Sequence, residues 1–443
     1  MIRTVPFLAV LLSFAAAGVQ AERIRVPAVD GALAQALLTA SEGDELVLAP
    51  GRHAGPVLIG KPVTLRGETG AVIDANGSGS VVTIDAPDVT VATLTLTGSG
   101  RSHEEIDSGV SLTKKARGAR VLDNLIEGNL YGVDIHGARD ALIKGNTITG
   151  LRLKRMNDRG NGIYVWNAPG SVVEGNEIRY GRDGIFSNVS KRNVYRDNLM
   201  RDLRFAVHYM YTNDSEVSGN VSIGNHMGFA MMYSDRIVAR DNISIKDRDY
   251  GVMLNYTKSS DVFGNIVVQG AEKCAFIYNS HKNLVAENVF DGCDIGIHFT
   301  AGSEGNTVTG NAFVANRTQV KYVGNRDIEW SFEGRGNYWS DHTAFDLDGD
   351  SRADSAYRPN DLMDHILWSQ PAAKLLLGAP AVQIVRWSQA QFPATLPGGV
   401  VDSHPLTIPP VRDVPQPYLT LAQSDPLWAT GGESDDTQPF QPD

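Results

Sequence analysis

Methionine and histidine side chains recur about one repeat apart in the middle of the chain. Met210 and Met232 are 22 residues apart, and Met253 follows 21 residues later. Thioether and imidazole groups are soft ligands that suit Cu(I) and do not suit Mg²⁺ or Ca²⁺. The predicted copper ligands are His208, Met210, Met232 and Met253, with His226 and Met227 as further candidates. Such methionines also serve as packing under a loop or against another protein, and that alternative stays open.

Carboxylates form a second group with chemical meaning. Asp346, Asp348, Asp350 and Asp354 lie in one acidic loop, at a spacing that can surround a hard cation. Oxygen ligands of this kind favour Ca²⁺. The loop lacks the glycine at the sixth position and the glutamate at the twelfth position of an EF-hand. A structural calcium site and a solvated acidic turn are therefore both compatible with the sequence.

An asparagine repeat must position these side chains. The asparagines, usually in a Gly-Asn or Asp-Asn pair, are Asn124, Asn146, Asn176, Asn198, Asn220, Asn242, Asn265, Asn288, Asn311 and Asn337. Their successive spacings are 22, 30, 22, 22, 22, 23, 23, 23 and 26 residues, a period typical of a stacked solenoid. We predict an all-β, right-handed parallel β-helix whose coils stack ~4.8 Å apart, with the asparagines bonded to one another at an inside corner. Asparagine also tolerates left-handed backbone geometry.

A short β-rich segment, usually beginning with glycine, follows most of these asparagines. If that first residue is position one, positions two and four are nearly always apolar, as in Val207 and Tyr209, and are predicted to point inward. Positions three and five then point outward and place the methionines on an exposed apolar face, a feature that marks binding sites. Aromatic residues on or beside this face are predicted partner contacts: Trp166, Tyr211, Tyr233 and Tyr256.

The two ends of the chain differ from the repeat. Residues 1–21 read as a secretory signal peptide, with Arg3 before an apolar run and a small-residue cleavage site. We predict a β-helix over residues 22–340, with a capping helix at residues 31–40, an acidic loop at 341–359 and a tail at 360–443. Within the tail, residues 366–392 are expected to be helical in pieces broken at Pro371 and Pro380. The proline-rich remainder is expected to be extended or disordered unless a partner holds it.

Charge and cysteine content limit the possible partners. The 443-residue chain has a formal net charge of −11, which argues against nucleic acid as the main partner. Its two cysteines, Cys274 and Cys293, fall on neighbouring coils but about three residues out of register. A disulfide formed through a bend and a pair of free buried thiols are both compatible with this spacing.

Three motifs resemble the NosD family, the periplasmic maturation proteins of nitrous-oxide reductase. They are residues 155–162 (RMNDRGNG), residues 204–214 (RFAVHYMYTND) and residues 336–341 (GNYWSD). The resemblance implies a periplasmic protein that docks on an ABC transporter, whose membrane subunit is NosY and whose ATPase is NosF. It also implies a copper-chaperone lipoprotein (NosL) as a partner and copper delivery to nitrous-oxide reductase. The tail, with Leu367, Trp368, residues 375–377 and Trp387, would hold the membrane subunit.

Two functions from different classes follow. The first is a non-catalytic binding and assembly module, because the chain has neither a phosphate-binding G-x-x-x-x-G-K-[ST] loop nor an obvious Ser-His-Asp arrangement. The second is a polysaccharide lyase or epimerase, in which the outward aromatic residues would stack on sugar rings. Such an enzyme needs outward carboxylates and a base, and positions three and five offer Asp134 and Lys321 alone. The sequence therefore favours the binding module.

Overall fold

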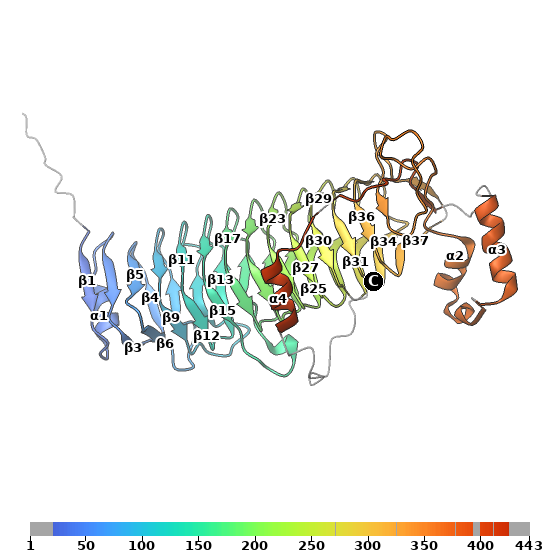
Figure 1. The fold of residues 1–443 in the computed structure, drawn as a ribbon. Helices are drawn as coiled ribbons and strands as arrows, with labels where there is room; N and C mark the ends of the chain where they lie inside the picture. The colour runs from blue at the N-terminus through green and yellow to red at the C-terminus, as the bar shows by residue number, and fades with distance from the viewer. Residues whose placement is uncertain are drawn as a thin grey trace, which may run out of the picture.

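The computed structural model is a right-handed parallel β-helix, drawn lengthwise in Figure 1. It describes residues 21–270, 272–324, 326–376, 378–392, 399–410 and 412–424. Three long sheets, here named A, B and C, run along the solenoid. Along most of the solenoid, each coil contributes one strand to each sheet. The predicted fold class is confirmed. The predicted signal peptide lies almost wholly outside the described residues.

The strands of the three sheets are short, and within each sheet neighbouring strands come from successive coils. Sheet A consists of β1 (Arg23–Val26), β2 (Glu45–Leu48), β5 (Thr64–Gly67), β8 (Thr90–Ala92), β11 (Arg120–Leu122), β14 (Leu142–Lys144), β17 (Val172–Glu174), β20 (Val194–Arg196), β23 (Glu216–Ser218), β26 (Val238–Arg240), β29 (Asp261–Phe263), β32 (Leu284–Ala286) and β35 (Thr307–Thr309). Sheet B consists of β3 (Gly51–Ala54), β6 (Ala71–Asp74), β9 (Thr95–Thr97), β12 (Leu125–Glu127), β15 (Thr147–Thr149), β18 (Glu177–Arg179), β21 (Leu199–Arg201), β24 (Val221–Ile223), β27 (Ile243–Ile245), β30 (Ile266–Val268), β33 (Val289–Asp291), β36 (Ala312–Val314) and β39 (Tyr338–Trp339). Sheet C consists of β4 (Val57–Ile59), β7 (Val82–Ile84), β10 (Ser108–Leu112), β13 (Tyr131–His136), β16 (Ile163–Trp166), β19 (Asp183–Asn188), β22 (Phe205–Met210), β25 (Met227–Met232), β28 (Tyr250–Asn255), β31 (Lys273–Tyr278), β34 (Ile295–Thr300) and β37 (Thr318–Val323).

The hydrophobic core fills the inside of the coils. Val207, Tyr209, Phe229 and Met231, from positions two and four of sheet C, are at most 1% exposed. Because side chains alternate along a strand, positions three and five of the same strands point away from this core. Helix α1 (Ala32–Thr39) packs against β1, β2 and β3 at the N-terminal end of the solenoid, as the predicted capping helix should.

The asparagine ladder is confirmed as a continuous chain of hydrogen bonds inside the solenoid. In each coil the asparagine donates both its backbone N–H and its side-chain Nδ2–H to the Oδ1 of the next asparagine, as Asn198 does to Asn220 at 3.1 and 2.9 Å. The sequence suggested that the asparagine itself adopts the left-handed conformation. In the structure the residue before it does so, with φ 57° at Asp197 and φ 64° at Gly219. Glycine or aspartate tolerates this geometry, which explains the Gly-Asn and Asp-Asn pairs.

The C-terminal end of the ladder is closed by a segment far away in the sequence. Asp402 follows β40 (Gly399–Val401), which pairs with β38 (Asp327–Glu329). Its Oδ2 accepts hydrogen bonds from the backbone N–H of Asn337 at 2.6 Å and from Nε1 of Trp339 at 2.8 Å. Asp402 therefore takes the place that the next asparagine would have occupied.

Helices α2 (Leu362–Ser369) and α3 (Pro380–Gln391) project beyond this end of the solenoid (Figure 1). A 3-10 helix (Pro371–Leu376) separates them, so the predicted breaks at Pro371 and Pro380 are confirmed. Asp361 caps α2 by accepting the N–H of Asp364. None of the described helices is long and apolar enough to cross a membrane.

The chain then returns along the outside of sheet B. Residues 399–410 and 412–415 contain no helix, in keeping with the expected extended tail, and residues 416–424 depart from that expectation by forming a helix. Helix α4 (Gln416–Ser424) packs Tyr418, Leu421 and Ala422 on outward residues of β24 and β27. Residues 393–398 and 425–443 lie outside the described residues. A disulfide joins Cys274 in β31 to Cys293 in the turn before β34, with Cα atoms 5.7 Å apart, which decides between the two alternatives for these cysteines.

Candidate metal centre

Four methionines gather on the outer side of sheet C. We name Met210, Met227, Met232 and Met253 the methionine cluster. Met210 pairs with Met232 across β22 and β25, as predicted, and Met253 pairs with Ala230 across β25 and β28. All four methionines belong to one packed group of side chains, which is separate from the core inside the coils. The 22-residue repeat therefore brings thioether groups from three consecutive strands together.

Aromatic side chains surround the methionine cluster. Phe205, Tyr250, Phe276 and Tyr278 pack against it from β22, β28 and β31. The sequence predicted an exposed face, and this expectation is wrong, because Met227, Met232 and Met253 are 3%, 4% and 1% exposed. Long side chains on strands only ~4.8 Å apart cover one another. Met210 remains half-buried at the edge of the group.

His208 lies beside the methionine cluster and is held on three sides. Its ring stacks on Phe186 and Phe205, with ring centres 4.7 and 4.4 Å away. Its Nδ1 lies 3.2 Å from Oδ2 of Asp183, and its Nε2 is buried without a hydrogen-bond partner among the described residues. His208 pairs with Ala230 on the next strand, and the single methyl group of Ala230 lies between His208 and Met253. With its proton on Nδ1, the ring has a free lone pair on Nε2, and it lies on the same outer face of sheet C as the thioethers.

The charges behind His208 determine its protonation. Burial alone would raise the pKa of Asp183, but the positive charge of Arg204 and the hydrogen bonds to Asp183 outweigh it and lower that pKa. Arg204 donates to both carboxylate oxygens, at 2.8 and 2.7 Å. Burial lowers the pKa of His208, with the Asp183 hydrogen bond acting in the opposite direction. At neutral pH the pair is thus a carboxylate beside a neutral imidazole, and a neutral imidazole is the form that binds metals.

His226 occupies a different position from His208. It lies in the turn directly before β25, next to Met227 in the chain, and it is 5% exposed. Its Nδ1 is 3.8 Å from Oδ2 of Asp249, and its backbone N–H donates to the carbonyl of Leu203. We therefore place His226 at the border of the site, while His208 and the methionine cluster form its centre.

The arrangement suits a soft cation held by few ligands. One neutral ring nitrogen and up to four thioethers match the preferences of Cu(I), and these groups carry no negative charge that would attract Mg²⁺ or Ca²⁺. Thioethers on flexible methionine side chains adapt to an incoming ion at small cost. The surrounding aromatic groups exclude water, which would compete for the metal. The residues present therefore fit copper.

Tyrosines form an exposed ladder beside the cluster. Tyr211 stacks on Tyr233 with ring centres 5.2 Å apart, and Tyr233 stacks on Tyr256 at 5.0 Å. Each of the three is at least 37% exposed. Trp166, three coils before Tyr233 on the same side, stacks on His136 at 4.3 Å. The predicted partner contacts on this face are therefore accessible aromatic surfaces.

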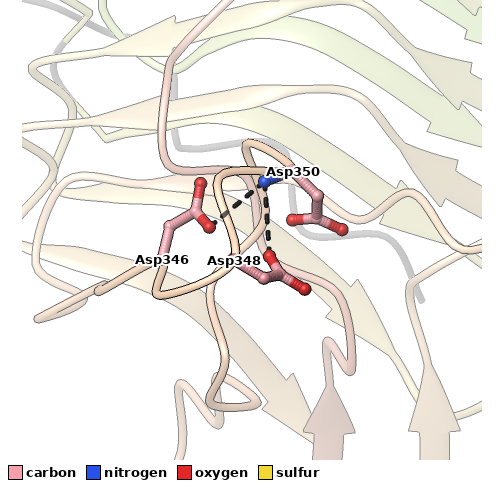
Figure 2. Close-up of side chains that lie close together, drawn as sticks. All are labelled: Asp346, Asp348 and Asp350. Carbon is pink, nitrogen blue, oxygen red and sulfur yellow. Dashed lines mark hydrogen bonds between the residues drawn. The ribbon is translucent and has the colours of Figure 1, made fainter.

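The acidic loop gathers three of its four predicted carboxylates. One oxygen of each of Asp346, Asp348 and Asp350 lies within 4.8 Å of the others (Figure 2). Asp346 and Asp348 both accept the backbone N–H of Asp350, at 3.2 and 3.3 Å. Asp354 has another role, because its Oδ2 accepts the N–H of Leu347 and closes the loop. Calcium at this loop stays a prediction, with three carboxylates in place of four.

Calcium titration tests this loop. We expect one Ca²⁺ to bind with a Kd of about 10⁻⁴ to 10⁻³ M, as in extracellular calcium modules, because only three carboxylates come together and two of them are exposed. Asp348→Asn removes one charge and should weaken binding at least about fivefold, measured by isothermal titration calorimetry. Asp294→Asn, at an exposed aspartate paired with Arg317, is the control and should bind as the wild type does. Absence of binding at millimolar Ca²⁺ would show that the loop is a solvated turn.

Sequence reasoning missed Asp183, Arg204 and Ala230 as parts of the site. The repeat contained a signal for Asp183, although strict alternation would turn the residue directly before position one inward; in the structure this position faces outward and contributes to the methionine cluster. At that position β19 has Asp183 where β22, β25 and β28 have Phe205, Met227 and Tyr250. A carboxylate in an otherwise apolar column indicates a specific partner.

Comparison with known proteins identifies a family and several curated relatives, of which two are described here. The model of the family described as periplasmic copper-binding protein (NosD) matches residues 145–344. A protein from Stutzerimonas stutzeri named probable ABC transporter binding protein NosD is 41% identical over 373 residues, which are 81% of this chain and 86% of that protein. The protein with the same name from Pseudomonas aeruginosa is 39% identical over 383 residues, which are 84% of this chain and 89% of that protein.

Solved structures resemble the fold at low identity. The N-terminal fragment of gene product 12 from bacteriophage Phi29 has a TM-score of 0.53 at 13% identity, over 67% of this chain and 66% of that one. An alginate lyase from Paenibacillus sp. has a TM-score of 0.44 at 19% identity, over 60% of this chain and 94% of that one. At such identities the likeness concerns the β-helix alone.

Proposed function

Because the chain belongs to the NosD family of periplasmic copper-binding proteins, we propose that it binds Cu(I) in the periplasm through His208 and the methionine cluster. The observation that carries the proposal is the buried Nε2 of His208, which has no hydrogen-bond partner among the described residues and belongs to the sheet face that carries the four thioethers. A buried polar atom without a partner calls for an explanation, and a bound soft cation supplies one.

The proposal extends to transfer of the metal. Copper arrives from a copper-chaperone lipoprotein of the NosL type and leaves toward nitrous-oxide reductase, for its copper-sulfide centre. Ligands are exchanged one at a time, and half-buried Met210 is the thioether that an approaching protein reaches first. The exposed stacked tyrosines Tyr211, Tyr233 and Tyr256, together with Trp166, offer the aromatic surface on which such a partner docks.

An ABC transporter supplies membrane attachment and energy in this proposal. Its membrane subunit corresponds to NosY and its ATPase to NosF. Both relatives carry the name of ABC transporter binding proteins, which supports such a docked and non-catalytic role. Release of unsaturated products from uronate polymers by the purified protein would instead support the lyase or epimerase function.

Helices α2 and α3 are the proposed attachment to the membrane subunit. They project from the solenoid and expose large apolar side chains, which on a soluble surface mark a binding site. Ile384, Trp387 and Phe392 are 66%, 65% and 61% exposed, and Leu375 is 91% exposed. Leu367 and Trp368 of α2 are half-buried.

Capture of the transporter tests the attachment. Truncation of residues 360–443 is unsuitable, because it removes Asp402, which closes the asparagine ladder. We expect Ile384→Ser with Trp387→Ser to reduce recovery of the membrane subunit at least about tenfold in a pull-down from solubilised membranes, because aromatic anchors dominate such interfaces. Leu38→Ser with Leu58→Ser changes two equally exposed residues at the opposite end and is the matched control. Equal recovery with both variants would exclude α3 as the attachment.

A further inference from the structure

We propose that Asp183, supported by Arg204, is a positioning residue that fixes the proton of His208 on Nδ1 and so presents Nε2 to the metal. The inference rests on the proposed copper site and names the group that orients its single nitrogen ligand. It concerns a residue that touches His208 and not the metal itself.

The geometry places the proton shared by His208 and Asp183 on the ring. Asp183 is fully buried and accepts three hydrogen bonds, two from Arg204 and one from His208 Nδ1. An ionised carboxylate is an acceptor only, so the proton between His208 and Asp183 lies on Nδ1. A neutral imidazole has one proton, and Nε2 is therefore left with a free lone pair.

The position of the ring is fixed as well as its protonation. Phe186 and Phe205 stack on both sides of His208, with interplanar angles of 28° and 21°. A rotation that exchanged the two nitrogens would break the contact with Asp183 and leave a buried charge with one partner fewer. Carboxylates that hold a metal-binding histidine in this way orient the ring and strengthen it as a ligand.

A purely structural role explains Asp183 less well. Burial of a carboxylate and a guanidinium is unfavourable, and replacement of such a pair by apolar residues is often neutral or stabilising. The neighbouring coils carry Phe205 and Met227 at the equivalent position, so the sheet does not require an ion pair there. The contact that distinguishes Asp183 from these residues is its hydrogen bond to His208.

The test replaces the ion pair as a unit. Asp183→Leu with Arg204→Leu removes the acceptor together with its bidentate partner, and the nearby Arg182, whose Nη2 lies 3.8 Å from Asp183, keeps partial access to solvent. The matched control is Arg179→Leu with Asp202→Leu, which removes a half-buried pair, bonded at 2.8 Å, on the neighbouring sheet B. Two measurements are made on each full-length mature protein: Cu(I) affinity by competition with a chelator, and the ¹⁵N shifts of the His208 ring without metal. The His208 signals are assigned by their loss in His208→Gln.

We expect wild-type His208 to carry its proton on Nδ1 in the metal-free protein. The Asp183/Arg204 variant should lose this preference and bind Cu(I) about 10–100-fold more weakly, as other outer-sphere changes do. The Arg179/Asp202 control should change neither quantity. Wild-type His208 protonated on Nε2, or unchanged affinity in the Asp183/Arg204 variant, would overturn the inference.

The outcome separates this inference from the proposed function. If removal of the thioethers weakens Cu(I) binding and the Asp183/Arg204 variant binds as the wild type does, then the copper site stands and the role of Asp183 is wrong. If removal of the thioethers also leaves binding unchanged, then the copper site itself is wrong. The fold of each variant is checked by its thermal unfolding midpoint, so that loss of structure is not mistaken for loss of a ligand.

Discussion

Met210→Ala with Met232→Ala should weaken Cu(I) binding at least about tenfold, which corresponds to about 1.4 kcal/mol. The two side chains pair directly across β22 and β25, and together they supply two of the four thioethers of the methionine cluster. The metal would be left with one nitrogen ligand and the more deeply buried Met227 and Met253. The measurement is an anaerobic competition titration of the mature protein against a chelator of known Cu(I) affinity.

Controls for this prediction lie in the same strand. Alanine at a buried methionine also leaves a cavity, which costs about 2–5 kcal/mol of stability. Met210→Leu with Met232→Leu removes the sulfur atoms and keeps nearly the same volume, so it should show the same loss of affinity. Met231→Leu changes the neighbouring methionine, which points into the core and is 0% exposed, and it should bind as the wild type does. Unchanged affinity in the Leu double variant would remove the thioethers from the site.

Asn220→Ala should destabilise the folded solenoid by about 3 kcal/mol or more. Oδ1 of Asn220 accepts two hydrogen bonds from Asn198, and its Nδ2 donates to the carbonyl of Tyr195 at 2.8 Å and to Oδ1 of Asn242 at 3.0 Å. All of these groups are buried, so the substitution leaves several polar atoms without partners inside the protein. Each such atom costs about 1–3 kcal/mol.

Denaturant unfolding measures this effect. Asn220→Ala should shift the midpoint of the transition to a clearly lower urea concentration. Asn157→Ala, at an exposed position of the loop between β15 and β16, serves as the control and should shift it little. A loss below about 1 kcal/mol for Asn220→Ala would mean that the ladder contributes much less than its hydrogen bonds indicate.

The fold could be predicted because the same residue types recur at the same positions of each repeat. The spacing from Asn124 to Asn337 gave the coil length, and apolar alternation in each segment gave the inward positions. These local rules act the same way in every coil, so one register assigns the whole solenoid. The pairing of Met210 with Met232 followed from that register alone and is confirmed.

Other parts of the site depend on contacts that the repeat does not encode. The methionine cluster is buried because long side chains on three neighbouring strands pack against one another. Alternation predicts only the face of the sheet to which each side chain points. Asp183 was missed because it precedes the glycine from which the segments were numbered. Asp402 completes the ladder 65 residues after Asn337, and no periodicity connects two such segments. The packing of α4 on sheet B likewise joins residues that are far apart in the sequence.

X-ray absorption at the copper edge tests the central claim most directly. The mature protein, loaded with one equivalent of Cu(I), should show sulfur neighbours together with one imidazole, and the sulfur signal should fall in Met210→Leu with Met232→Leu. Cys274→Ser with Cys293→Ser serves as the control for cysteine sulfur and should leave the spectrum unchanged, because both cysteines are joined in a disulfide. A shell of nitrogen and oxygen only, or a sulfur signal that disappears with the cysteines and not with the methionines, would contradict a copper site on the outer side of sheet C.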